Sequence, residues 1–369
     1  MKISKVWLKT ILIGLVLFDM MGGCIASHRA PNSVDVLPQY VVERTWTTNL
    51  PDPDRAPLRG VDFMPDGKRI VSGWRSGIAK MWDISSGKPL LHMDDTPDLN
   101  STVFREACYR GVVVSSDGRT ALTGNTTLLT TDPIVPEKSD FDAKLWDLHD
   151  GHLLRKFKGE FPFISAVALS PNGRICAVSG EHESFNLWDA EDGHLIHAMS
   201  GTGADAEALA FSHNGKWILS CGLPGATLWD IKTGSEKWRF IGEQRTLTSA
   251  AFSPDDKTVA VADWGGVVHI LNATDGIRKQ RIKVGASHCD DIKFSPDGKI
   301  LAIATTTAVP PPRISLPVKS IIMFVRTDSW TIYARTEPIS AQIWSIAFSH
   351  DGKRLACAAD GRVVVWHAQ

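Results

Sequence analysis

One short pattern occurs seven times along the chain and constrains its fold more than any other feature. Each copy is an apolar run, a turn rich in Ser, Pro, Asp, Asn and Gly, and a second apolar run. Such a copy predicts a β-hairpin. Units repeated in this way stack on one another, since no single hairpin can bury its apolar face alone. The copies are VDFMPDGKRIVSG (61–73), VVVSSDGRTALTG (112–124), VALSPNGRICAVSG (167–180), LAFSHNGKWILS (209–220), AAFSPDDKTVAVA (250–262), IKFSPDGKILAIA (292–304) and IAFSHDGKRLACA (346–358).

A third apolar run follows each hairpin, and in four copies it ends in Trp-Asp. A polar turn and a fourth run come next, so each unit predicts a four-stranded antiparallel sheet. This layout resembles the WD-repeat family of β-propellers over residues 40–369. The resemblance implies an all-β, seven-bladed propeller in which the Trp packs inside the blade and the Asp orders the turn. The family's Gly-His pair before each blade is absent, which makes the chain a divergent member. The dipeptides are Trp82-Asp83, Trp146-Asp147, Trp188-Asp189 and Trp229-Asp230, and later copies have Leu271-Asn272, Val325-Arg326 and Trp366-His367.

The seventh copy has no fourth run, because only three residues follow Trp366. The segment YVVERTWTT (40–48), ahead of the first hairpin, is similar to the fourth runs HLLRKFKG (152–159) and HLIHAMSG (194–201). The resemblance implies that this N-terminal strand completes the last blade. An open ring would leave an unpaired strand edge. We therefore predict that residues 40–48 close the propeller.

Three intervals between copies are longer than the others. The spacings between the Phe positions of successive hairpins are 51, 55, 42, 41, 42 and 54 residues. The additional residues lie in 94–108, between blades 1 and 2, and in 124–142 and 305–320, between the second and third strands of blades 2 and 6. The family's strand order implies that all three emerge on one face, around blades 6, 7, 1 and 2. Loops of this kind often carry binding, although neutral drift remains the alternative.

The innermost strands supply the candidate site. In the family, the residue four before each Phe position points toward the mouth of the central channel. That ring reads Arg59, Arg110, Ser165, Glu207, Thr248, Asp290 and Trp344. Arg and Trp dominate protein-interface hot spots, and an Arg fork can hold a carboxylate at two points. We expect Arg59, Arg110, Trp344, Asp290 and Glu207 to bind a protein or peptide; the alternative is that the two acids simply neutralise the arginines.

Catalytic and cofactor signals are weak. The chain has no G-x-S-x-G, H-E-x-x-H or P-loop motif, and Gly201-Thr202-Gly203-Ala204-Asp205-Ala206 lies in a blade connection rather than a strand–helix turn. The Asp-Gly-His turns at 150–152 and 192–194 belong to different blades, so we predict neither a metal site nor a cofactor. A net charge of −1 and the lack of a basic stripe argue against nucleic acid. The prediction is a non-enzymatic interaction scaffold; the alternative is an extracytoplasmic hydrolase or lactonase-like propeller acting at the channel mouth.

The N-terminus has the pattern of a targeting segment. Three Lys precede the apolar run 11–18, which is shorter than the roughly 20 residues of a membrane span and suits a signal peptide. Met21-Gly22-Gly23-Cys24 resembles a bacterial lipobox, with Met in place of the usual Leu. We predict a signal peptide at 1–23, lipid on Cys24, a polar tether at 24–39 and a membrane-anchored protein of the cell envelope. Secreted, uncleaved and cytoplasmic forms are the alternatives.

The remaining cysteines are predicted to be structural. Cys176, Cys221 and Cys357 fall late in apolar strands. A thiol in such a position is usually a small buried hydrophobe.

Overall fold

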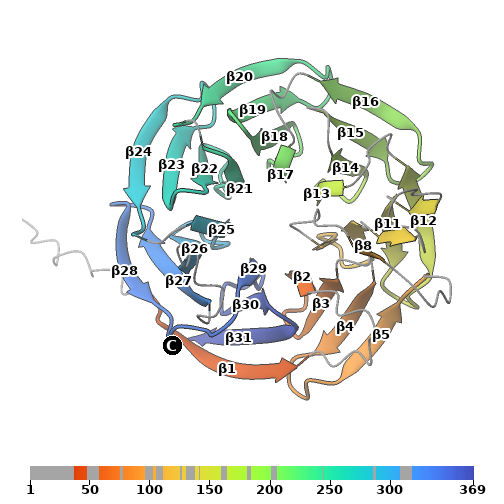
Figure 1. Ribbon diagram of the computed structural model, residues 1–369, viewed down its shortest axis with the longest axis horizontal. Helices are drawn as coiled ribbons and strands as arrows, with labels where there is room; N and C mark the ends of the chain where they lie inside the picture. The colour runs from red at the N-terminus through yellow and green to blue at the C-terminus, as the bar shows by residue number, and fades with distance from the viewer. Residues whose placement is uncertain are drawn as a thin grey trace, which may run out of the picture. The chain divides into compact units, whose positions relative to one another are not determined.

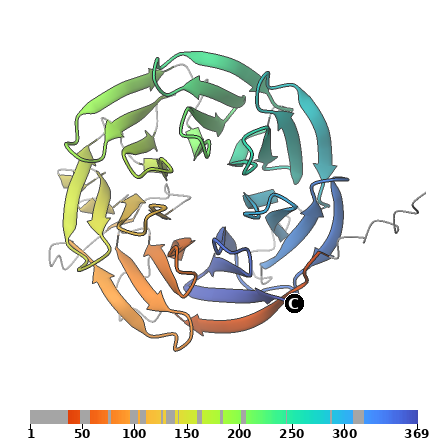
Figure 2. The same ribbon diagram turned by 180° about the vertical axis from the view of Figure 1, so that it is seen from behind.

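The seven repeats fold as the blades of a ring. The computed structural model describes residues 37–47, 58–74, 78–95, 103–104, 111–124, 127–129, 138–140, 142–158, 164–180, 184–200, 206–243, 245–285, 288–307 and 318–369. The chain divides into two compact units, Met1–Leu37 and Pro38–Gln369. The second unit is an all-β propeller with seven blades of four antiparallel strands (Figures 1 and 2). The predicted fold class is therefore confirmed.

Each blade runs outward from the central channel, with sequence order equal to strand order in blades 1 to 6. The innermost strands are β2 (Leu58–Phe63), β7 (Val112–Val114), β13 (Ile164–Leu169), β17 (Ala206–Phe211), β21 (Leu247–Phe252), β25 (His288–Phe294) and β29 (Ile343–Phe348). The second strands are β3 (Arg69–Trp74), β8 (Thr120–Gly124), β14 (Ile175–Gly180), β18 (Trp217–Gly222), β22 (Thr258–Asp263), β26 (Ile300–Thr307) and β30 (Arg354–Ala359).

The third and outermost strands complete the blades. The third strands are β4 (Ala79–Asp83), β11 (Asp142–Asp147), β15 (Ser184–Asp189), β19 (Gly225–Asp230), β23 (Val267–Asn272), β27 (Lys319–Arg326) and β31 (Arg362–Ala368). The outermost strands are β5 (Pro89–Met93), β12 (Leu153–Lys158), β16 (Leu195–Ser200), β20 (Glu236–Ile241), β24 (Arg278–Lys283), β28 (Thr331–Arg335) and β1 (Tyr40–Thr47).

Several predicted features lie outside the described residues. These are the signal segment, Cys24, all but the last residues of the tether, Arg110 and the third insertion between residues 308 and 317. Among the described residues, no helix has the length and apolar character needed to cross a bilayer.

The hydrophobic core lies between blades rather than within them. Between blades 1 and 7, for example, Phe63 and Trp82 pack with Ala356, Val363 and Val365. Similar buried clusters lie between blades 1 and 2, 2 and 3, 3 and 4, 4 and 5, and 5 and 6. Each blade therefore buries its two faces against its neighbours, as a repeat protein requires. Free Cys176, Cys221 and Cys357 are buried in these strands, which confirms their predicted structural role.

The Trp and Asp residues of the repeat have the structural roles implied by the resemblance. The indole Nε1 atoms of Trp146 and Trp229 each donate a hydrogen bond of 2.9 Å to a hydroxyl on the neighbouring second strand, Thr123 Oγ1 and Ser220 Oγ. The carboxylate of Asp83 accepts hydrogen bonds from the Ser85 hydroxyl and from the amide and hydroxyl of Ser86. These bonds lower the pKa of Asp83 to about 2, so the carboxylate stays ionised and holds its turn.

The N-terminal strand closes the ring, as predicted. Strand β1 pairs with β31 from Tyr40 to Thr47, giving blade 7 the order β1-β31-β30-β29. The Tyr40 ring stacks on Phe324 of blade 6 with centroids 4.9 Å apart, and its hydroxyl donates to the carbonyl of Gly352 at 2.8 Å. Arg354 donates to both carboxylate oxygens of Glu43 at 2.7 and 3.1 Å. Burial raises the pKa of Tyr40, so its hydroxyl remains a donor.

We expect Tyr40→Ala to lower the free energy of unfolding by about 3–4 kcal/mol, because it removes a buried ring from the closing strand. Tyr40→Phe should cost only about 1 kcal/mol, since it removes the hydroxyl but keeps the stacked ring. Chemical denaturation of the two variants and the parent chain measures both values. Equal stability of Tyr40→Ala and the parent would contradict the assigned role of β1.

Blade 3 has a gap in the indole hydrogen bonds. The buried Nε1 atom of Trp188 has no hydrogen-bond partner among the described residues, and the second-strand position that holds a hydroxyl in blades 1, 2 and 4 is Val178. We expect Val178→Thr to raise the free energy of unfolding by about 1 kcal/mol, because the new hydroxyl gives the indole an acceptor. Denaturant titration measures the change. Val178→Ala is the control, which should destabilise, and a loss of stability in Val178→Thr as well would refute the interpretation.

Candidate functional site

A β-bulge occurs at the predicted ring position in six blades. The pairing of the innermost with the second strand skips one residue each time, and that residue is the predicted one. A bulge leaves one residue out of the ladder and redirects its side chain. The repeat therefore places one side chain from each of these six innermost strands outside the strand ladder. The bulged residues are Arg59, Ser165, Glu207, Thr248, Asp290 and Trp344.

Arg59 and Trp344 form one unit across the junction of blades 1 and 7. The Arg59 guanidinium carbon lies 3.4 Å from the centroid of the Trp344 ring, and Arg59 is only 8% exposed. The Trp344 indole donates to Asp360 Oδ1 at 3.1 Å. A guanidinium stacked on an aromatic face in this way is held by the ring's negative π-surface. The pair therefore presents a fixed aromatic and cationic wall, while Arg110, its predicted companion, lies outside the described residues.

The other predicted residues line a small cavity at the mouth. Its volume is about 30 Å³, which is roughly the space of one water molecule. Asp290 is held on one side of it by a 2.6 Å bond from Thr306 Oγ1 and a 3.2 Å bond from Gln342 Nε2. His288 Nε2 lies 3.3 Å from the same carboxylate. Blades 4 to 7 all contribute to the lining, which consists of Glu207, Thr248, Trp264, His288, Cys289, Asp290, Gln342 and Trp344.

Trp264 is the site residue that sequence reasoning missed. It lies in the turn between β22 and β23, is 49% exposed, and stacks on His288 with ring centroids 5.2 Å apart. The ring positions lie on the innermost strands, whereas the Trp264 side chain reaches the mouth from the turn between β22 and β23. A signal was present, because a Trp followed by two Gly residues is unusual in a polar turn. An exposed indole at the edge of a cavity is typical of a contact residue.

Two of the three insertions meet in a small sheet beside the blades. Strand β6 (Val103–Phe104), from the connection between blades 1 and 2, pairs with β9 (Thr127–Leu129) of blade 2. Strand β9 also pairs with β10 (Lys138–Asp140). These two of the three insertions predicted to share one face therefore lie together. Asp95, where the first insertion begins, lies 2.5 Å from the buried ammonium of Lys144, and this ion pair ties the insertion to blade 2.

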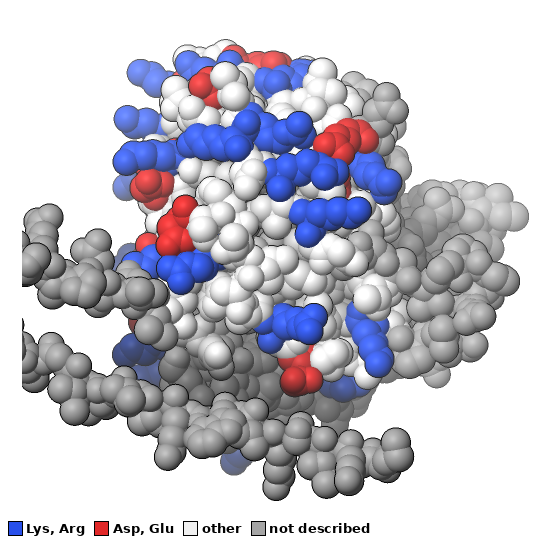
Figure 3. Space-filling model, turned by 90° about the vertical axis from the view of Figure 1, so that its left-hand side faces the viewer, with Lys and Arg blue, Asp and Glu red and all other residues white. Residues whose placement is uncertain are grey.

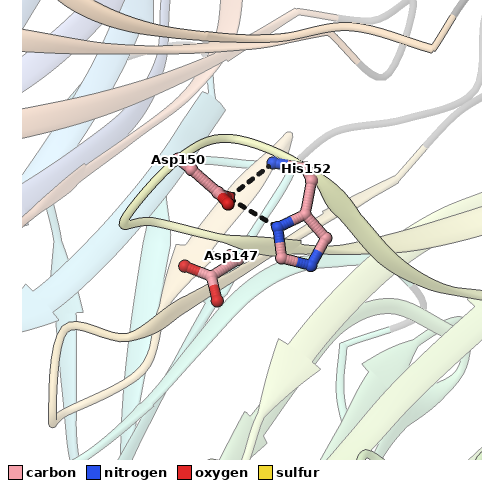
Figure 4. Close-up of side chains that lie close together, drawn as sticks. All are labelled: Asp147, Asp150 and His152. Atoms are coloured by element: carbon pink, nitrogen blue, oxygen red, sulfur yellow. Dashed lines mark hydrogen bonds and ion pairs between the residues drawn. The ribbon is translucent and has the colours of Figure 1, made fainter.

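Two turns place carboxylates and imidazoles close together. The possible ligand atoms of Asp147, Asp150 and His152 lie within 4.8 Å of one another (Figure 4). The same is true of Asp189, Asp192 and His194 in the next blade. The Asp150 carboxylate accepts a hydrogen bond from the His152 amide at 3.1 Å, and Asp147 accepts one from the amide of His149 at 2.6 Å. The His152 amide and ring lower the pKa of Asp150. These groups hold the turn, as the sequence predicted.

Comparison with known proteins agrees with the architecture. The model of the family described as "WD domain, G-beta repeat" matches residues 151–189 and 333–367. The chain is 26% identical to Protein groucho of Drosophila melanogaster over 116 residues, which are 31% of this chain and 13% of that protein. It is 24% identical to the WD repeat-containing protein SL1-17 of Schistosoma mansoni over 137 residues, or 37% and 41% of the two chains. The chain thus matches less than half the length of each relative.

The repeats, the ring and the comparisons lead to one assignment. Each matched segment runs from the outermost strand of one blade through the first three strands of the next, blades 2 and 3 in the first case and blades 6 and 7 in the second. All seven copies form four-stranded blades of one ring. The chain is a WD-repeat β-propeller.

Proposed function

We propose that the chain is a non-enzymatic interaction platform that binds a protein or peptide at the channel mouth and is anchored in the cell envelope by lipid on Cys24. WD-repeat propellers commonly act as protein-interaction scaffolds. The observation that carries the proposal is the bulge repeated at the ring position in six blades, which takes one side chain per blade out of the strand ladder and redirects it. The proposed surface runs from Glu207 in blade 4 through Asp290 and Trp344 to Arg59 in blade 1.

The size of the mouth cavity favours a macromolecular partner. Pockets for small molecules typically enclose about 300–1,000 Å³. The cavity at Asp290 encloses about 30 Å³, so it offers little room for a substrate. The residues around it include an exposed Trp264 and a half-buried Trp344, and Arg59 stacks on Trp344. Trp and Arg belong to the residue class that carries most binding energy at protein interfaces. A partner laid across the mouth would bury Trp264 and Trp344 together.

The mouth proposal predicts that Trp264→Ala loses the partner. Affinity capture from native membranes with the parent chain should recover a protein that the variant fails to recover, with direct binding to the purified partner at least about tenfold weaker. Trp264 is half-exposed, so truncating it should leave the propeller folded. The matched control is Trp330→Gly, which removes a half-buried Trp from the turn between β27 and β28, at the opposite end of the third strands. Equal binding by the parent and Trp264→Ala would reject the mouth as the interface.

Lipid anchoring predicts that Cys24→Ala moves the protein out of the membrane fraction. Most of the protein should leave the membrane fraction, because two or three acyl chains anchor a protein stably and the variant would carry none. Fractionation of cells, with mass spectrometry of the mature N-terminus, measures it. An unmodified Cys24 in the parent chain would refute lipidation, and this outcome leaves the mouth experiment unaffected.

A further inference from the structure

The outermost strand of blade 5 concentrates positive charge. Strand β24 carries Arg278, Lys279, Arg281 and Lys283, all exposed, within six residues. The whole chain has a net charge of −1, so the rest of it has −5. The next most basic outer strand, β12, holds three cations. Figure 3 shows this side of the molecule, where Lys and Arg outnumber Asp and Glu. The near-neutral net charge therefore conceals a local basic surface.

Two of the four cations have no ion pair within the described structure. Arg278 and Arg281 share the carboxylate of Glu243, at 3.3 and 3.0 Å. Lys279 and Lys283 have none among the described residues, and both are exposed. Counting Glu243 against the four cations leaves a local charge of +3. The charge is thus available to an external anionic surface.

Exposed isoleucines lie beside these cations. Ile277, directly before β24, is 65% exposed, and Ile332 on the neighbouring outer strand β28 is 44% exposed. Ile277 directly precedes β24 and Ile332 is the second residue of β28, so both lie near the start of the outermost strand on adjacent blades. We call Ile277, Ile332 and the four cations of β24 the blade 5–6 rim. Cations combined with exposed aliphatic side chains are typical of surfaces that lie in a membrane interface.

The chain also enters the propeller next to this rim. The hydroxyl of Tyr333, on β28, donates to the carbonyl of Pro38 at 3.1 Å. Pro38 therefore lies against blade 6, the blade next to β24.

We propose that the blade 5–6 rim rests on anionic phospholipid headgroups. The cations of β24 are attracted to the negative surface potential, and each contributes favourably only within about a Debye length of it. Ile277 and Ile332 add contact with the headgroup and acyl boundary. In this orientation the outer strands of blades 5 and 6 face the membrane and the channel axis lies parallel to the membrane plane. The mouth remains accessible to a partner. The inference depends on neither acylation of Cys24 nor binding at the mouth.

Vesicle flotation of the full chain tests the rim. Every form carries Cys24→Ala, so that acylation does not contribute, and binding to phosphatidylcholine vesicles is compared with and without phosphatidylglycerol at low and high salt. Lys279→Glu with Lys283→Glu should weaken partition onto the anionic vesicles about tenfold or more. The control, Lys68→Glu with Lys88→Glu on blade 1, makes the same change in charge at exposed sites and should bind like the parent.

Further variants and ligands separate the contribution of the isoleucines from that of the cations. Ile277→Ser with Ile332→Ser should weaken binding while leaving its salt dependence unchanged, because these side chains carry no charge. Equal binding by the rim and control variants, or no preference of the parent for anionic vesicles, would overturn the proposal. Rim-dependent binding of polyglutamate without rim-dependent binding of vesicles would overturn it too, and would assign the rim to an acidic polypeptide.

Discussion

The pairing of β1 with β31 is the constraint on which the propeller depends. Each blade buries its apolar faces against the neighbouring blades. The ring therefore leaves an apolar face exposed unless its last blade is complete. The closing strand is fixed by three kinds of contact at once: the backbone ladder, the Tyr40 ring stacked on Phe324, and the Arg354 fork on Glu43. Because the contacts join residues about 300 positions apart, closure comes at a high cost in chain entropy and is supported by correspondingly many interactions.

A closed ring gives the channel mouth its geometry. The bulge in each innermost strand is a local feature, but only the ring brings the bulged residues from different blades together. Arg59 begins the first blade and Trp344 the last, and their stacking at 3.4 Å exists because the two blades are neighbours in the closed propeller. The same closure places the entry of the chain at Pro38 against blade 6, on the side that carries the basic strand β24. The proposed partner surface and the proposed lipid surface are thus separate parts of one rigid ring.

The fold was largely predictable from the sequence, because its signals are local and repeated. Turn residues mark each hairpin, and Trp-Asp marks the third strand and the turn after it. Where one copy departs from the repeat, its hydrogen bonding changes with it. Val178 replaces a hydroxyl residue, and the Trp188 indole has no acceptor among the described residues. The ring positions were predictable for the same reason, since they stand at a constant distance from the Phe of each copy. Trp264 was not, because it lies in the turn between β22 and β23, outside the innermost strands that carry the ring positions.

The sequence by itself determined the number of blades, their strand content, the closing role of residues 40–47 and the identity of the side chains at the mouth. Periodicity and turn chemistry act over a few residues and can be read directly. Tertiary structure alone decided that Arg59 stacks on Trp344, that Asp290 is held by Thr306 and Gln342, and that β24 carries its charge beside the point of chain entry. Those contacts join different blades or distant strands, and their partners are chosen by ring geometry rather than by sequence spacing.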